Sequence, residues 1–187
     1  MRASRLSFAV AALLLAGLAP AAAAPPPTTP ETGIGPVTKL PLPRYASLKT
    51  DRVNLREGPS KDHRTLWVFQ RAGLPVEIVG EFETWRRIRD SEGTEGWVLH
   101  SLLSGRRTAI VNAGPDKGAE KSAIPLRAKA DEGAADEARL QTGVIGSVKT
   151  CSSGWCRLIV TLPNRRDVDG YIRQNRLWGV YPNEVVE

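Results

Sequence analysis

From residue 45 onward, short apolar runs alternate with polar residues and are separated by turn-forming residues. Val53 and Leu55, with polar residues between and after them, follow the two-residue period of a strand with one buried face. The runs break at 57–60, 71–73 and 90–93, which contain Gly, Pro or Asp and predict turns. The pattern predicts strands at 45–48, 53–56, 66–69, 74–79, 84–89 and 95–99.

The second half of the chain repeats this plan with longer loops. Residues 112–123 are polar and contain glycine, which predicts a loop, and 163–167 form a charged hairpin turn. Residues 136–140 are compatible with one short helical turn. Strands are predicted at 108–111, 124–127, 144–150, 155–162 and 170–173.

Five landmarks of the first half recur 70 to 75 positions later. The pairs are Leu55-Arg56 with Leu126-Arg127, Gly73 with Gly143, Trp85 with Trp155, Gly96-Trp97 with Gly170-Tyr171, and Leu102-Leu103 with Leu177-Trp178. Such a repeat indicates two copies of one small unit.

Short strands with frequent turns, about five strands per unit, are typical of small antiparallel barrels. The predicted fold class is therefore all-β, with two tandem small β-barrels. A core of this size is marginal alone, so the two barrels are expected to pack on each other.

The N-terminal part of the chain has a different composition. Residues 1–24 join Arg2 and Arg5 to an apolar stretch and an alanine-rich end, which predicts a secretory signal peptide; a retained membrane anchor is the alternative. Residues 25–43 contain seven of the fourteen prolines and predict an extended linker or a disordered mature N-terminus. The barrels are then assigned to 44–105 and 106–187, and the protein to the periplasm or the cell exterior.

The charge of the chain is moderately positive. The full chain has a net charge of +6, and without Arg2 and Arg5 the remaining 24 basic and 20 acidic residues give +4. This charge favours anionic surfaces such as cell-wall polymers or acidic proteins. Export makes nucleic acid an improbable partner, and no integral membrane span is expected after signal removal.

Several of these motifs, in this order, resemble the signature of bacterial SH3-like (Src-homology-3-like) domains. In the first copy they are Val53-Asn54-Leu55-Arg56-Glu57-Gly58-Pro59-Ser60, Gly73 before a Val/Ile strand, Trp85-Arg86-Arg87-Ile88 and Gly96-Trp97-Val98. The second copy has Ala128-Lys129-Ala130-Asp131 in place of the Gly-Pro-Ser turn and resembles the family through the repeat and Gly154-Trp155-Cys156-Arg157.

The resemblance implies a tandem of SH3-like β-barrels that bind rather than catalyse. Relatives act in envelope interactions or are attached to cell-wall enzymes, often with peptidoglycan or peptide ligands. Eukaryotic members bind Pro-rich helices in a groove of tyrosines and a proline, which residues 45–48 and 97–100 of this chain do not reproduce.

Trp85 and Trp155 are the leading candidates for ligand contacts. Ile88 and Leu158 lie three residues after them, so in a strand both tryptophans face away from the core. They either stack on a sugar or peptide ligand or cover the neighbouring barrel. Four further aromatic residues are expected in the core or at its rim, and two of them, Trp97 and Tyr171, join the candidate ligand-binding residues; the four are Trp67, Trp97, Tyr171 and Trp178.

Arginine clusters provide a second candidate feature. Arg86, Arg87 and Arg89, with Arg106 and Arg107, predict a basic patch near Trp85, and five arginines of the second copy do the same: Arg157, Arg165, Arg166, Arg173 and Arg176. The planar guanidinium suits carboxylate and phosphate ligands, so Arg87 and Arg157 are candidate ligand residues. The alternative is a solvated strand face. Arg56 and Arg127 either bond a loop carbonyl or line a groove.

Cys151 and Cys156 are the only cysteines and flank a tight turn, which predicts a disulfide in an oxidising compartment. A nucleophilic cysteine needs a histidine base, and His63 and His100 both belong to the first copy. No metal site and no cofactor are expected. The predicted function is a non-catalytic envelope-binding module for peptidoglycan or an envelope peptide. The alternatives are a structural protein–protein interaction factor and, remotely, a Cys-dependent wall hydrolase.

Overall fold

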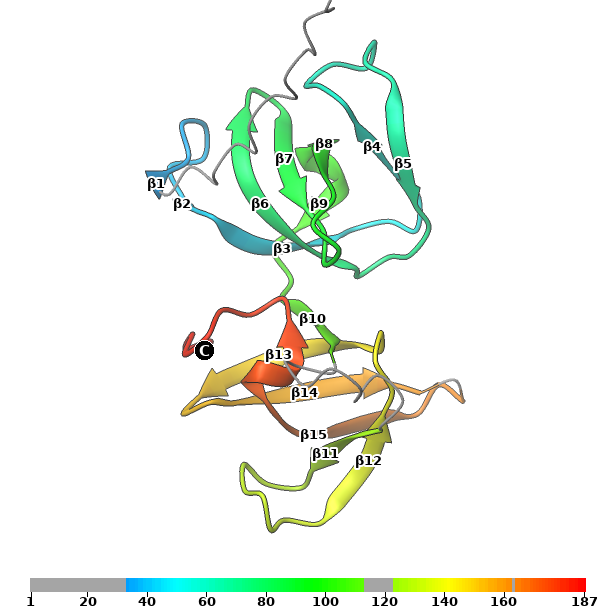
Figure 1. Cartoon of the computed structure of the whole chain (residues 1–187), viewed down its shortest axis with the longest axis vertical. Helices are drawn as coiled ribbons and strands as arrows, with labels where there is room; N and C mark the ends of the chain where they lie inside the picture. Colours follow the sequence, from blue (N-terminus) through cyan, green and yellow to red (C-terminus); the bar gives the residue numbers. More distant parts are fainter. Residues whose placement is uncertain (1–32, 113–122, 163) are drawn as a thin grey trace, which may run out of the picture.

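The computed structural model describes residues 33–112, 123–162 and 164–187. These residues form two seven-stranded sheets and a two-stranded hairpin, and each sheet curls into a small barrel (Figure 1). The predicted all-β tandem is confirmed.

The first barrel orders its strands β5-β4-β8-β7-β6-β3-β9. Its strands are β3 (Arg44–Leu48), β4 (Val53–Arg56), β5 (Thr65–Phe69), β6 (Pro75–Phe82), β7 (Trp85–Arg89), β8 (Glu95–Leu99) and β9 (Leu103–Ser104). A 3₁₀ turn at His100–Leu102 links β8 to β9.

The second barrel has the matching order β12-β11-β15-β14-β13-β10-β16. Its strands are β10 (Thr108–Val111), β11 (Ile124–Arg127), β12 (Asp136–Leu140), β13 (Ile145–Ser152), β14 (Trp155–Thr161), β15 (Asp167–Arg173) and β16 (Leu177–Trp178). A 3₁₀ turn at Gln174–Arg176 stands where the first barrel has its own. The repeat in the sequence is therefore a repeat of topology.

Two local predictions were wrong. Each sheet contains seven strands rather than about five, because the short strands β9 and β16 and the strand β12 were not predicted. Residues 136–140 form strand β12, not a helical turn, because they pair with β11 from Ile124↔Leu140 to Arg127↔Asp136. Tertiary pairing outweighs the weak helical propensity of this segment.

Each barrel has its own apolar core, built from alternate residues of the strands. In the first barrel Leu55, Ile88 and Val98 are fully buried. Leu126, Leu158 and Ile172 take the equivalent places in the second, and Leu126 and Leu158 are fully buried. The apolar residues of the predicted strands thus point inward as the two-residue period requires.

Gly96 and Gly170 let β8 and β15 approach the core closely. A Cβ on Gly96 would lie 2.6 Å from Leu55 Cγ and 2.8 Å from the Arg56 carbonyl oxygen. A Cβ on Gly170 would lie 2.7 Å from Leu126 Cγ and 2.8 Å from the Arg127 carbonyl oxygen. This contact explains why the glycine recurs at the same place in both copies.

Gly96→Ala should therefore destabilise the protein by about 1–3 kcal/mol, because the added methyl group overpacks a site bounded partly by backbone. Urea denaturation followed by tryptophan fluorescence measures this change. Gly105→Ala is the matched control, since a Cβ there meets no atom within 4 Å. Equal stability of the two variants would contradict the packing explanation.

The predicted linker is partly folded. Residues 33–43 include β1 (Gly33–Ile34) and β2 (Pro41–Leu42), which pair as a hairpin beside the first barrel (Figure 1). Leu42 is buried in the core of that barrel. The prediction of an extended linker is therefore wrong for 33–43, while residues 25–32 and the predicted signal at 1–24 lie outside the described residues.

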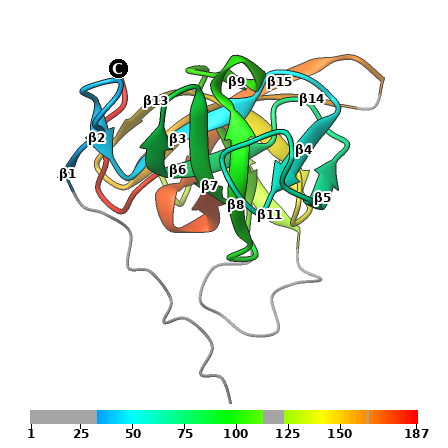
Figure 2. The same cartoon turned by 90° about the horizontal axis from the view of Figure 1, so that it is seen from above.

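The two barrels pack on each other, as expected, through aromatic and polar side chains. The Tyr45 ring of the first barrel lies 5.2 Å from the Trp178 ring and 4.6 Å from the Tyr181 ring of the second. Tyr181 Oη donates a 2.9 Å hydrogen bond to Glu77 Oε1. The C-terminal segment that carries Tyr181 runs between the barrels in Figure 1, and Figure 2, seen from above, shows the first barrel lying over the second.

Cys151 and Cys156 form the predicted disulfide, with an S–S distance of 2.03 Å. They face each other across β13 and β14 and close the hairpin turn Ser153-Gly154. The Cys151 backbone also pairs with Val186 near the C-terminus. The disulfide therefore fixes the strand edge to which the C-terminal segment binds.

Reduction of this disulfide should lower the free energy of unfolding by about 2 kcal/mol or less, because the closed loop is short. Urea denaturation of oxidised protein, with and without dithiothreitol, measures the change. The double variant Cys151→Ala/Cys156→Ala serves as control and should be insensitive to dithiothreitol. A midpoint that reductant does not move in the wild type would contradict a stabilising role.

Candidate ligand-binding surface

An arginine–aromatic–arginine row crosses the outer face of each barrel. In the first barrel Trp97 on β8 pairs with Arg87 on β7 and Arg56 on β4. In the second barrel the row consists of Arg157, Tyr171 and Arg127, on β14, β15 and β11. The structure thus brings four predicted ligand residues into two equivalent rows: Arg87 and Trp97 in the first, Arg157 and Tyr171 in the second. Arg56 of β4 and Arg127 of β11 are the third members of these rows.

Trp85 and Trp155 begin β7 and β14, two residues before the arginine of each row. They share the outer face with that arginine and lie outside the apolar clusters that fill the barrels. Each is nevertheless only 7% exposed. Both tryptophans lie on the strand face predicted for them, opposite Ile88 and Leu158, but both side chains are buried there.

Trp85 lines a hollow of about 280 Å³ on the first barrel. Its partner across the strands is Leu99, and Leu102 of the 3₁₀ turn completes an apolar wall. The remaining lining residues are polar or basic: Arg52, Asn54, Arg56 and Lys61.

Trp155 lines a larger hollow of about 780 Å³ on the second barrel, which also includes Tyr45 of the first. The Arg173 guanidinium stacks on the Trp155 ring, with Cζ 4.2 Å from the ring centroid. Arg173 Nε also donates to Glu132 Oε1 at 2.6 Å. In this hollow a protein arginine already occupies the face of the tryptophan.

Arg56 and Arg127 satisfy both alternatives considered for them. Arg56 Nη1 donates to the carbonyl oxygens of Lys61 and His63, at 2.9 and 2.7 Å. Arg127 Nη1 donates to the Ala134 carbonyl oxygen at 3.0 Å and to a carboxylate oxygen of Asp136. Each arginine therefore holds the loop after its strand and also lines the hollow of its barrel.

The arginines of the predicted basic patch near Trp85 are held by partners within the protein, mostly carboxylates. Arg87 pairs with Glu95 at 2.6 Å and Arg89 with Glu77 at 2.6 Å. The other three arginines are also engaged: Arg86 is buried beside Glu81, Arg106 donates to Ser147 and Arg107 pairs with Glu184.

In the second copy Arg157 and Asp169 form a bidentate pair, with hydrogen bonds of 2.9 and 2.6 Å. The hydrogen bond from Arg157 lowers the pKa of Asp169. Carboxylates on adjacent strands thus neutralise much of the arginine charge that the sequence displays.

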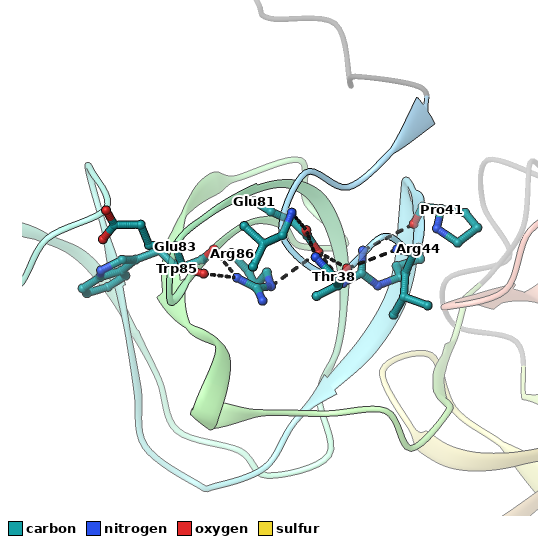
Figure 3. A network of polar contacts seen from close by, with 9 residues as sticks. Thr38, Pro41, Arg44, Glu81, Glu83, Trp85 and Arg86 are labelled. Atoms are coloured by element: carbon teal, nitrogen blue, oxygen red, sulfur yellow. Dashed lines mark hydrogen bonds and ion pairs between the residues drawn. The ribbon is translucent and has the colours of Figure 1, made fainter.

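Glu81, at the end of β6, ties the N-terminal hairpin to the first barrel (Figure 3). Its buried carboxylate accepts hydrogen bonds from the Val37 and Thr38 backbone N–H groups, from Thr38 Oγ1 and from Arg44 Nη2, at 2.6 to 3.0 Å. The Arg86 guanidinium lies on its other side, 3.5 Å away. Burial alone would raise the pKa of Glu81, but these hydrogen bonds outweigh it and lower the pKa to about 2.

A folded-state pKa below the usual 4.5 means that ionised Glu81 stabilises the fold. This contribution, at most about 3 kcal/mol, should be complete above about pH 5.5 and disappear as the pH falls through 2. Glu81→Gln should lower the urea midpoint of unfolding at pH 7. The gap between the midpoints of the variant and the wild type should narrow progressively below pH 4.5. A pH-independent difference would contradict this assignment.

The residues that join the barrels were not predicted as such. Tyr45 and Tyr181 carry no motif, and Trp178 was expected in the core or at its rim. Burial, with a smaller effect of the Glu77 charge, raises the pKa of Tyr45 to about 12, and burial with the hydrogen bond to Glu77 raises that of Tyr181. Both phenols therefore stay protonated at neutral pH, which keeps Tyr181 a donor.

Trp67 was expected in the core or at its rim, and this was wrong, because it is 60% exposed on β5, at the edge of the first sheet. The equivalent position in the second barrel is Ala138, which pairs with Leu126 as Trp67 pairs with Leu55. The first barrel therefore carries an exposed aromatic side chain that its copy lacks.

The reactive side chains of the described residues are engaged or scattered. Both cysteines are in the disulfide, so neither offers a thiol nucleophile. In the described ranges no group of three His, Cys, Asp or Glu residues could hold a metal ion. None of the helical segments described here is long and apolar enough to cross a membrane.

The paired hollows and the matching sheets define a tandem of SH3-like β-barrels with a repeated outer surface. A family model described as the bacterial SH3 domain matches residues 49–105 and 120–179, more than half of the chain. The chain therefore belongs to the bacterial SH3 domain family. No curated protein matches it.

Solved structures that match this chain include NlpC2 and NlpC1 from Trichomonas vaginalis, each at 12% identity and a TM-score of 0.31. They match 73% and 77% of this chain and 48% of their own length. A third, a novel NlpC/P60 endopeptidase from Photobacterium damselae subsp. piscicida, has 14% identity and a TM-score of 0.29 and matches 72% of this chain. The chain spans about half the length of the first two and a third of the last.

Proposed function

We propose that the protein is a non-catalytic binding module of the bacterial cell envelope, which attaches to peptidoglycan or to an envelope peptide in the periplasm or outside the cell. One observation carries this proposal. A tryptophan at the start of β7 or β14 lines a hollow at the same place in both barrels, although the residues around it differ. Both tryptophans lie outside the apolar clusters that fill the barrels, although each is only 7% exposed.

The family supports this function. Bacterial SH3 domains are typically cell-wall binding modules and act outside the cytoplasm. A disulfide is expected in the same oxidising compartment. The six ligand residues we propose are Trp85, Arg87, Trp97, Trp155, Arg157 and Tyr171. Arg87 and Arg157 would act while paired to Glu95 and Asp169, so they orient the row more than they supply free charge.

A second function, docking to another envelope protein, is favoured by the edge of the first sheet. Trp67 is 60% exposed and Leu66 40% exposed on β5, which pairs with β4 alone among the described strands. An apolar edge strand can accept a strand or a side chain of a partner protein. This surface is separate from the hollow of Trp85.

Co-sedimentation with purified peptidoglycan sacculi tests the first function. Trp85→Ala and Trp155→Ala should each weaken retention about tenfold, since a buried aromatic contact contributes at least about 1–2 kcal/mol. Trp85→Phe and Trp155→Phe preserve the apolar volume and should retain more binding. Thermal unfolding of each variant separates lost contacts from lost structure.

Trp67→Ala removes the same side chain outside both hollows and is expected to leave retention unchanged. Retention that survives in the folded Trp85→Ala/Trp155→Ala double variant would refute the hollow as the binding surface. Loss of retention in Trp67→Ala alone would instead show that the binding surface lies at the edge of β5.

A further inference from the structure

The first hollow combines an apolar wall with a concentration of positive charge. Trp85, Leu99 and Leu102 line one side, and three basic side chains line the other: Arg52, Arg56 and Lys61. Its lining, taken over the described residues, contains Asn54 but no Asp or Glu. A ligand in this hollow therefore meets three basic side chains beside an apolar surface.

Within the described part of the chain, none of these three basic side chains forms an ion pair with a carboxylate. Ten described arginines form ion pairs with carboxylates, whereas Arg56 donates only to the Lys61 and His63 carbonyl oxygens. These two bonds orient the Arg56 guanidinium without neutralising it. Arg52 and Lys61 are exposed, and in the described ranges neither side chain pairs with a carboxylate.

The second hollow shows that the fold itself does not require this charge. Glu132 stands at the position of Lys61, five residues after the arginine of the row, and Ala123 stands at that of Arg52. Arg173 replaces Leu99 opposite the tryptophan and pairs with Glu132. The two barrels therefore place opposite charges at one equivalent position, and only the first hollow is purely basic.

We propose that the first hollow binds an oxyanion, a carboxylate or a phosphate, carried on a sugar of a wall polymer. This inference rests on the proposed function and names the ligand class at Trp85. Guanidinium and ammonium groups donate charge-assisted hydrogen bonds to either oxyanion, and Arg56 is already oriented to do so. The apolar wall of Trp85, Leu99 and Leu102 would pack against the less polar face of the sugar ring.

The test compares binding of the full chain to three preparations of sacculi: untreated, with carboxyl groups converted to amides, and with phosphate removed by hydrofluoric acid. The variant Arg52→Gln/Lys61→Gln removes two positive charges without touching a hydrogen-bonded side chain. Its matched control, Lys49→Gln/Lys129→Gln, removes two charges from exposed lysines outside both hollows.

Arg52→Gln/Lys61→Gln should weaken binding to untreated sacculi at least about tenfold, while the control variant binds like wild type. Amidation should reproduce this loss if the ligand is a carboxylate, and phosphate removal should do so if it is a phosphate. Either result supports the oxyanion site and identifies its source.

Wild-type affinity of Arg52→Gln/Lys61→Gln, together with loss of binding in Trp85→Ala, would overturn the oxyanion site and leave the proposed function intact. An equal loss in the control variant would also overturn it, because binding would then follow net charge alone. Failure of the wild-type chain to bind any preparation would refute attachment to peptidoglycan and this inference with it.

Discussion

The close contact between a leucine of β4 or β11 and a glycine of β8 or β15 underlies both the barrel and its surface. Leu55 fills the space that a side chain at Gly96 would need, and Leu126 does the same at Gly170. Because the strands meet this closely, Arg56 pairs with Trp97 and Arg127 with Tyr171 on the opposite face. The packed interior thereby determines the spacing of the outer rows and of the hollows beside them.

The two barrels stabilise the same hairpin, β6–β7 in the first and β13–β14 in the second, by different interactions. At the β6–β7 hairpin Glu81 lies opposite Arg86, and at the β13–β14 hairpin Cys151 lies opposite Cys156. Glu81 binds the N-terminal hairpin through its carboxylate, while Cys151 binds Val186 near the C-terminus through its backbone. An ion-pair network and a covalent bond thus stabilise equivalent strand edges, and each edge anchors the terminal segment that belongs to its barrel.

Contacts between the barrels turn two marginal units into one structure. Tyr181 reaches from the C-terminal segment to Glu77, which Arg89 also holds, and Arg107 binds Glu184 of the same segment. Burial opposes ionisation of Glu184, but hydrogen bonds from Arg107 and from the Tyr181 backbone lower its pKa. Since Tyr45 of the first barrel lines the larger hollow, the surface of the second barrel depends on this docking.

The sequence by itself determined the two barrels, most strand positions, the disulfide and the strand face on which Trp85 and Trp155 lie. These follow from short-range rules: a two-residue period, turn-forming residues, and two cysteines flanking a tight turn. Only the tertiary structure decided which arginines remain free of carboxylates, because Arg87 and Glu95 meet across strands whose register the sequence does not display. It also decided that 136–140 is a strand, that Trp67 is exposed and that Tyr181 binds Glu77, since each depends on residues distant in the chain that folding brings together.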